Sequence, residues 1–303
     1  MPENQEVLSE VVIKFAGDSG DGMQLTGSQF TNNSAMLGLD LATFPDFPAE
    51  IRAPIGTLPG VSGFQLRFSS DRIFTPGDEC DVLVAMNAAA LKVNLKALKK
   101  GGRIIANTDG FDTRNLRLAN YPDGVNPLED NSLDNYELIK MDVTKMTREA
   151  LKDISMGTKE KDRAKNMFVL GFLYWMYNRS LDNTITFLTE KFGKKPEILE
   201  SNVKALQSGY NFGDTTETFT HRYSVAKAKM DPGTYRSIMG NQALAYGLIA
   251  ASQKSGVPLF LGSYPITPAT DILHELSKYK SFGIKTFQAE DEIAAITSAI
   301  GAS

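Results

Sequence analysis

Hydrophobic residues recur along the first part of the chain with the spacing of short strands separated by helices. The segment 10–17, EVVIKFAG, is a β-branched run that ends in glycine, and 22–38 has apolar residues at helical spacing. Further strands are predicted at VSGFQLRFS (61–69), CDVLVAMN (80–87) and GGRIIANTD (101–109). Residues 88–102 predict a helix that ends in lysines and glycine. Because strands and helices alternate, we expect an α/β domain with a parallel sheet.

The pattern changes after residue 160. Apolar residues in 161–176 and 196–213 recur as in helices, and Pro196 is placed as a first-turn proline. The segment 213–237 is polar, contains a Pro-Gly turn and lacks a sustained apolar period. We therefore predict a first domain over residues 1–212 and a linker over 213–237.

A second α/β unit is predicted over residues 238–303. Its pattern alternates helix and strand in the order 239–256, 257–265, 268–283, 284–291 and 292–303. One βαβ pair with one preceding helix is too small to close a doubly wound sheet. This segment is therefore expected to be the truncated, N-terminal part of a domain.

Composition excludes several classes of protein. The net charge is -4, and no dense block of lysine and arginine indicates binding to nucleic acid. The apolar run 167–177 is shorter than the roughly 20 residues that span a bilayer, and no signal peptide opens the chain. We expect a cytoplasmic protein that binds neither nucleic acid nor a membrane.

The chain is poor in residues that ligate metals. A single cysteine, Cys80, excludes an internal disulfide, and His221 and His274 lie far apart in sequence. No metal site is predicted, so an iron–sulfur cluster would have to come from another subunit. Cys80 stands beside Asp81, whose charge disfavours a thiolate, and is predicted to be a packing residue.

A glycine-rich loop, FAGDSGDGMQL, joins the first strand to the first helix. Gly17, Gly20 and Gly22 would let backbone N–H groups approach a phosphate at the helix N-terminus. However, the order G-x-x-G-x-G differs from the dinucleotide fingerprint, and Asp18 and Asp21 would repel a phosphate. A tight structural turn and a phosphate contact both stay open.

Two prolines enclose a threonine in the second unit, in the sequence SYPITP. Pro265 and Pro268 fix φ and lack N–H groups, so the chain must leave its strand in one rigid shape, with Ile266 and Thr267 held between them. At the carboxyl end of a parallel strand, the Thr267 hydroxyl would suit a carboxylate. Turn chemistry alone explains the same residues, and both interpretations stay open.

Three acids stand where the last strand meets the last helix. Glu290, Asp291 and Glu292 precede a helix rich in alanine, serine and glycine, which permits close packing against another backbone. A solvated acidic helix N-terminus is one account of these acids. The other is that one of them is buried at a site.

Several motifs carry a resemblance to a known family. They are GNQALAYGLIAA, YPITPAT and QAEDEIAAITSAIGAS in the second unit, and VVIKFAGDSGDG, CDVLVAMNAAAL, RAKNMFVLGFL and QSGYNFG in the first. The second unit resembles the opening of the thiamine diphosphate pyrimidine-binding domain in the alpha subunit of 2-oxoacid:ferredoxin oxidoreductases. The first resembles their gamma-type domain, fused ahead of the alpha domain as in 2-oxoglutarate-type members.

The resemblance implies roles for particular residues. Glu292 matches the glutamate that hydrogen-bonds N1′ of the aminopyrimidine and favours its imino tautomer. Thr267 matches the substrate-contacting threonine, and Tyr264, Pro265 and Ile266 would shape the wall beside the 2-oxoacid. In the first unit, Arg52 lies on the family's arginine-bearing loop and would meet an anion such as a CoA phosphate; a solvated or salt-bridged arginine is the alternative.

The resemblance also implies an activity. The chain is expected to act with a beta subunit in a hetero-oligomer that decarboxylates a 2-oxoacid, with 2-oxoglutarate preferred over pyruvate or a branched-chain 2-oxoacid. Thiamine diphosphate would be the cofactor, with its pyrophosphate and Mg²⁺ held by the partner. A [4Fe-4S] cluster on the partner would pass electrons to ferredoxin, and CoA would accept the acyl group. A non-catalytic assembly or regulatory subunit of the same fold is the rival hypothesis.

Overall fold

The structure is a computed structural model that describes residues 5–50, 53–216 and 222–303. The chain forms two compact units, Met1–Pro232 and Gly233–Ser303. Each unit has a hydrophobic core of its own.

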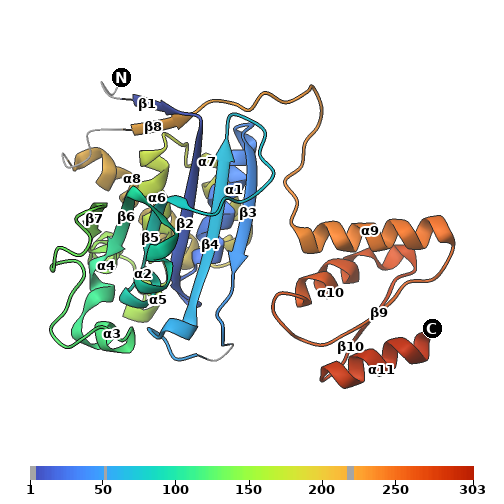
Figure 1. Cartoon of the computed structure of the whole chain (residues 1–303). Coiled ribbons are helices and arrows are strands. Elements are labelled where there is room, and N and C mark those ends of the chain that lie inside the picture. The colour runs from blue at the N-terminus through green and yellow to red at the C-terminus, as the bar shows by residue number, and fades with distance from the viewer. Residues whose placement is uncertain (1–4, 51–52, 217–221) are drawn as a thin grey trace. The chain divides into compact units, whose positions relative to one another are not determined.

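The first unit contains the elements from β1 to β8 in Figure 1. Its strands are β1 (Gln5–Leu8), β2 (Glu10–Asp18), β3 (Asp40–Asp46), β4 (Val61–Ser69), β5 (Cys80–Ala85), β6 (Leu98–Asn107), β7 (Glu137–Met141) and β8 (Arg222–Val225). Its α-helices are α1 (Met23–Met36), α2 (Ala88–Asn94), α3 (Thr113–Leu118), α4 (Val143–Ala150), α5 (Thr158–Asp162), α6 (Lys165–Met176), α7 (Asp182–Phe192) and α8 (Pro196–Thr215). Short 3-10 turns are η1 (Leu58–Gly60), η2 (Leu95–Ala97) and η3 (Thr108–Phe111).

Within the described residues, the main sheet has six strands in the order β3-β4-β2-β5-β6-β7. Strands β2, β5 and β6 were predicted and run parallel as expected, and β7, which was not predicted, continues the parallel order. Strand β4, predicted from 61–69, instead pairs antiparallel with both β2 and β3. The expected parallel sheet is therefore present, and β4 departs from it because β3 and β4 are joined without a crossover helix.

Alternate residues of β2 show how the sheet forms a middle layer. Ile13 and Phe15 pack into the core on the face covered by α1, α6 and α8 (Figure 1). Val12 and Ala16 pack into a separate core on the face covered by α2. Helices on both faces require strands that are apolar on both sides, which explains the continuous hydrophobic runs in the sequence.

Helix α6 contains most of the apolar run 167–177. Its residues from Asn166 to Met176 are buried, so its sequence is apolar on every side because it lies inside the first unit. Among the residues with described coordinates, every helix is too short or too polar to traverse a lipid bilayer.

Several features of the first unit differ from the sequence-based expectation. The helix predicted at 88–102 ends early, because Leu98 to Asn107 pair with β5 and β7 as strand β6. Strands β1, β3 and β7 were not predicted; β3 lies at the edge of the sheet, where its Pro45 costs no inner ladder bond. Part of the segment expected as a linker forms β8, which pairs with β1.

The second unit is a small α/β arrangement. Its elements are α9 (Gly240–Ser255), β9 (Phe260–Ser263), α10 (Thr270–Leu276), η4 (Ser277–Phe282), β10 (Lys285–Gln288) and α11 (Glu292–Ala302). Strands β9 and β10 are parallel, with α9 and α10 on one side of the pair and α11 on the other (Figure 1). A Cβ on Gly262 would lie only 2.5 Å from the Ser298 hydroxyl, so this glycine allows α11 to pack directly on β9.

Candidate functional site

The Tyr264–Pro268 turn and the three acids leave the same edge of the second unit. Ser263 and Gln288 are register partners at the carboxyl ends of β9 and β10. The Ala289 N–H continues this pairing by donating a 2.7 Å hydrogen bond to the Ser263 carbonyl. The turn after β9 and the acids after β10 therefore start side by side, as expected for a site at the carboxyl ends of parallel strands.

The three acids differ in what they contact. The Asp291 carboxylate caps α11 by accepting a 2.8 Å hydrogen bond from the Ala294 N–H. Glu292 is the first helical residue and is exposed, and no group among the described residues donates a hydrogen bond to its carboxylate. Glu290 is exposed as well. Glu292 is thus available to a ligand. Asp291 has the capping role that a solvated acidic helix N-terminus implies, and none of the three acids is buried in this chain.

The Tyr264–Pro268 turn lies at the surface of the second unit. Thr267 and Pro265 are exposed, and Tyr264 and Ile266 are half-buried. The Thr267–Pro268 peptide bond is cis. Two residues not singled out from the sequence contact the turn: Thr270 hydrogen-bonds Ile266, and Asn241 of α9 hydrogen-bonds the Pro268 carbonyl.

In the first unit, the glycine-rich loop is organised around the buried side chain of Asp18. This carboxylate accepts a 3.0 Å hydrogen bond from the Gly56 N–H and a 2.9 Å hydrogen bond from Asn87 Nδ2. Burial raises the pKa of Asp18 to about 6, although these hydrogen bonds oppose the shift. Donors that could bind a phosphate here instead bind a side chain of the protein.

The other acid of the loop is also paired. Asp21 forms a 2.7 Å ion pair with Lys165 and accepts a 2.9 Å hydrogen bond from the Asp18 N–H. Gly22 adopts φ 75° before α1, and a Cβ there would lie 2.5 Å from Asn166 Nδ2. Both the positive φ angle and the close packing against Asn166 therefore favour glycine at position 22.

Cys80 and Arg52 were also considered in the sequence, and the structure describes only the first of them. Cys80 is fully buried in the core under α2, and burial raises the pKa of its thiol to about 12, which agrees with the predicted packing role. Arg52 lies outside the described residues. Within the described residues, no group of three or more His, Cys, Asp or Glu side chains could hold a metal ion.

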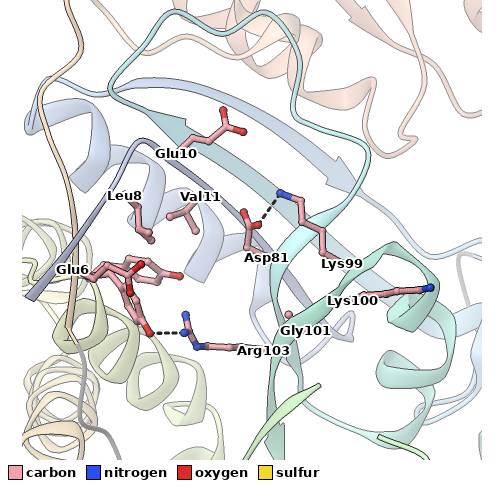
Figure 2. Close-up of a pocket in the computed structure, with 12 residues that line it drawn as sticks. Glu6, Leu8, Glu10, Val11, Asp81, Lys99, Lys100, Gly101 and Arg103 are labelled. Atoms are coloured by element: carbon pink, nitrogen blue, oxygen red, sulfur yellow. Dashed lines mark hydrogen bonds and ion pairs between the residues drawn. The ribbon is translucent and has the colours of Figure 1, made fainter. Parts of the chain in front are cut away.

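A cavity of about 270 Å³ lies at the amino ends of β2, β5 and β6 (Figure 2). Four of its charged residues form ion pairs: Lys99 with Asp81 at 2.7 Å, Arg103 with Glu137 at 2.5 Å, and Glu10 with Arg67 at 2.7 Å. Arg103 also donates to the Tyr223 hydroxyl (Figure 2). These pairings neutralise much of the charge in the cavity wall, and no sequence motif marked this place.

Two protein-family models match the chain. The model described as "Pyruvate ferredoxin/flavodoxin oxidoreductase" matches residues 12–212. The model described as "Pyruvate flavodoxin/ferredoxin oxidoreductase, thiamine diP-bdg", that is, thiamine-diphosphate-binding, matches residues 251–303. The second match contains both the Tyr264–Pro268 turn and Glu292.

Known relatives agree with these models. The 2-oxoglutarate oxidoreductase subunit KorA of Mycobacterium tuberculosis is 55% identical over 302 residues, which are 100% of this chain and 46% of that protein. The 2-oxoglutarate synthase subunit KorA of Archaeoglobus fulgidus is 45% identical over 67 residues, 22% of this chain and 18% of that protein.

A solved structure also resembles this chain. It is 2-oxoglutarate:ferredoxin oxidoreductase from Magnetococcus marinus with 2-oxoglutarate, coenzyme A and succinyl-CoA bound, at a TM-score of 0.70 and 28% identity. The match covers 98% of this chain and 46% of that one. This chain therefore spans about half the length of the Mycobacterium and Magnetococcus proteins.

Proposed function

This chain belongs to the pyruvate ferredoxin/flavodoxin oxidoreductase family, and we propose on that premise that it is the gamma-alpha fused subunit, or its N-terminal part, of a 2-oxoglutarate:ferredoxin oxidoreductase. The reaction is the oxidative decarboxylation of 2-oxoglutarate with CoA, which gives succinyl-CoA, CO₂ and a proton and passes two electrons to ferredoxin. The 55% identity over the whole chain to a 2-oxoglutarate oxidoreductase subunit supports this substrate over pyruvate or a branched-chain 2-oxoacid.

The single observation that carries the proposal is the shared edge of β9 and β10. It brings the carboxylate of Glu292, which has no partner in the described part of the chain, and the exposed hydroxyl of Thr267 to one end of two paired strands. Such an end is where α/β proteins bind ligands. In the proposal, residues 1–212 form the gamma-type domain, 213–237 the linker and 238–303 the first part of the pyrimidine-binding domain.

Thiamine diphosphate, when bound, supplies the carbon nucleophile and the electron sink that decarboxylation of a 2-oxoacid needs. Glu292 is assigned to hold a proton at N1′ of the aminopyrimidine. Glu292 fits the aminopyrimidine, because it is the first residue of α11 and lies at the same strand edge as the turn. Its carboxylate also has no partner among the described residues. With no donor bound to it among the described residues, the carboxylate has its full hydrogen-bonding capacity left for a ring nitrogen.

Thr267 is assigned to the substrate. Its hydroxyl donates to a carboxylate or carbonyl oxygen of the 2-oxoacid, and Tyr264, Pro265 and Ile266 form the adjacent wall, which excludes water from the reacting carbon. Arg52 is assigned to an anionic group such as a phosphate of CoA, for which the guanidinium offers bidentate hydrogen bonds.

The pyrophosphate, its Mg²⁺ and a [4Fe-4S] cluster are assigned to a beta subunit. Mg²⁺ prefers several oxygen ligands and iron–sulfur clusters need cysteines, whereas this chain has the single, buried Cys80. The part of the chain with described coordinates also lacks any cluster of three acidic, histidine or cysteine ligands. The proposal thus includes a hetero-oligomer in which two subunits share one cofactor.

The test is Glu292→Gln in the enzyme assembled with its beta subunit. The amide has the size of the carboxylate but favours the protonated pyrimidine nitrogen far less, so turnover should fall about 10²- to 10⁴-fold. Assembly, followed by gel filtration, should be unchanged. Glu290→Gln is the matched control and should keep turnover within about threefold, which corresponds to a change of no more than about 0.7 kcal/mol in the activation free energy.

Near wild-type turnover of Glu292→Gln would contradict the proposal. That result, with thermal stability also unresponsive to thiamine diphosphate and Mg²⁺, would favour the rival role of a non-catalytic assembly subunit.

A further inference from the structure

Thr270 binds the backbone of the residue just before Thr267. The Ile266 N–H donates a 2.8 Å hydrogen bond to Thr270 Oγ1, and the same hydroxyl donates 2.9 Å to the Ile266 carbonyl. The Thr270 N–H donates to that carbonyl as well, at 2.9 Å. One threonine therefore satisfies both backbone groups of Ile266.

This arrangement supplies a restraint that the prolines do not. Pro265 and Pro268 fix their own φ angles and bias the residues before them, Tyr264 and Thr267. Ile266 is the residue between the prolines that neither ring restricts. It is also the residue whose N–H and carbonyl both bind Thr270, so the hydrogen bonds complete the restraint of the turn.

Asn241 holds the other side of Thr267. Its Nδ2 donates a 3.0 Å hydrogen bond to the Pro268 carbonyl, which also accepts from the Asp271 N–H at 3.2 Å. Asn241 lies in the first turn of α9, so this bond ties the turn to a different helix from the one that contains Thr270.

Thr267 itself has no such partner. Its side chain is exposed, and no hydrogen bond joins it to another group in the described part of the chain. The backbone on both sides of Thr267 is thus fixed while its hydroxyl is left free, which is how a ligand-binding group is pre-organised.

From these contacts we infer that Thr270 and Asn241 are positioning residues that fix the Thr267 hydroxyl in the orientation in which it binds the 2-oxoacid. The inference rests on the role of Thr267 in the proposed function. Neither residue touches the substrate; each acts through the backbone next to Thr267. Loss of either restraint lets the hydroxyl move by a fraction of an ångström or more, and misplacement of about 1 Å costs about 10²-fold in rate.

The experiment uses the complete enzyme assembled with its beta subunit. Affinity for a phosphonate analogue of 2-oxoglutarate, which binds without losing CO₂, is measured by calorimetry, and KM and kcat are measured in parallel. Thr270→Val removes the hydroxyl at constant shape and Asn241→Ala removes the amide; each should weaken analogue binding about 10-fold or more. Thr270→Ser keeps the hydroxyl and should bind within about threefold of the wild type.

The control is Thr189→Val in α7. The Thr189 hydroxyl also donates to a carbonyl four residues back, that of Ile185 at 2.8 Å, and the residue lies in the first unit. The same chemical change there should leave analogue affinity, KM and kcat unchanged. Because the melting temperature is recorded for every variant, a loss of affinity with an unchanged melting temperature cannot come from unfolding.

A double-mutant cycle separates positioning from a merely structural role. If Thr270 acts through Thr267, the double variant Thr267→Val with Thr270→Val should bind no more weakly than Thr267→Val alone. Additive losses would overturn the inference, and so would full affinity in both Thr270→Val and Asn241→Ala. If Thr267→Val itself binds the analogue normally, the role of Thr267 in the proposed function fails, and the inference fails with it.

Discussion

Asp18 has the least ordinary environment of the acids in the glycine-rich loop. Only 7% of its surface is exposed, and burial raises its pKa to about 6 although two donors face its oxygens. The charged groups nearest to it are Asp21, which raises its pKa further, and Lys165, which lowers it. Asp18 therefore binds a proton more tightly in the folded protein than in the unfolded chain.

This linkage predicts how stability changes with pH. Since the pKa of Asp18 is raised from 3.8 to about 6, its favourable contribution is fully present below pH 3.8 and is lost as the pH rises through about 6. The loss amounts to about 3 kcal/mol in the free energy of unfolding. Asp18→Asn removes the titration, so its free energy of unfolding from urea denaturation should fall less than that of the wild type between pH 4 and pH 7.

Asp123→Asn is the control, because Asp123 is exposed. It should reproduce the wild-type difference between the two pH values. An equal difference in the Asp18→Asn variant would show that Asp18 does not titrate differently in the folded protein.

At this scale the sequence indicated only part of the candidate site. Thr267 stood out because two prolines enclose it, and Glu292 was one of three acids at a strand end, selected among them by the family resemblance. Asn241 and Thr270 could not be selected, since their importance comes from hydrogen bonds that exist only once α9 and α10 are folded around the turn. Asp18 was interpreted as a charge that repels phosphate, and its bond to Gly56, 38 residues away, was not foreseeable.

At the scale of elements, the tightest packing is that of α6 against α8. A Cβ on Gly171 would lie 1.9 Å from the Leu206 carbonyl oxygen, and one on Gly209 would lie 1.8 Å from the Phe168 carbonyl oxygen. No atom can be placed at such distances, so the two helices approach each other backbone to backbone only because both positions are glycine.

Gly209→Ala should therefore push the helices apart. We expect a loss of about 3 kcal/mol in the free energy of unfolding, at the upper end of the range for overpacked cores, measured by urea denaturation. Gly20→Ala is the matched control in the same unit, because a Cβ there would meet nothing within 4 Å. A Gly209→Ala variant as stable as this control would contradict the close packing.

Strands could be predicted from the sequence where a short hydrophobic segment marked them. Strands β2, β5 and the second half of β6 were predicted because each is a continuous apolar run. The lysines at 99 and 100 suggested a helix end, but pairing with neighbouring strands made that segment part of β6. The antiparallel direction of β4 depends on the connection from β3, which a window of hydrophobicity does not reveal.

At the scale of the whole molecule, the proposed function places the active site between this chain and a beta subunit. In that proposal the second unit contributes the turn and Glu292, whose carboxylate has no partner among the described residues. Two relatives that match 98–100% of this chain are about twice as long. The account therefore depends on one contact, between the Glu292 carboxylate and a cofactor whose other end is held elsewhere in the assembly.

The most direct test of that contact is an experimental structure of the assembled enzyme with thiamine diphosphate bound. The account predicts that a carboxylate oxygen of Glu292 lies within about 2.6–3.2 Å of N1′ of the aminopyrimidine. A structure in which the cofactor is bound while Glu292 faces solvent, away from the ring, would contradict it.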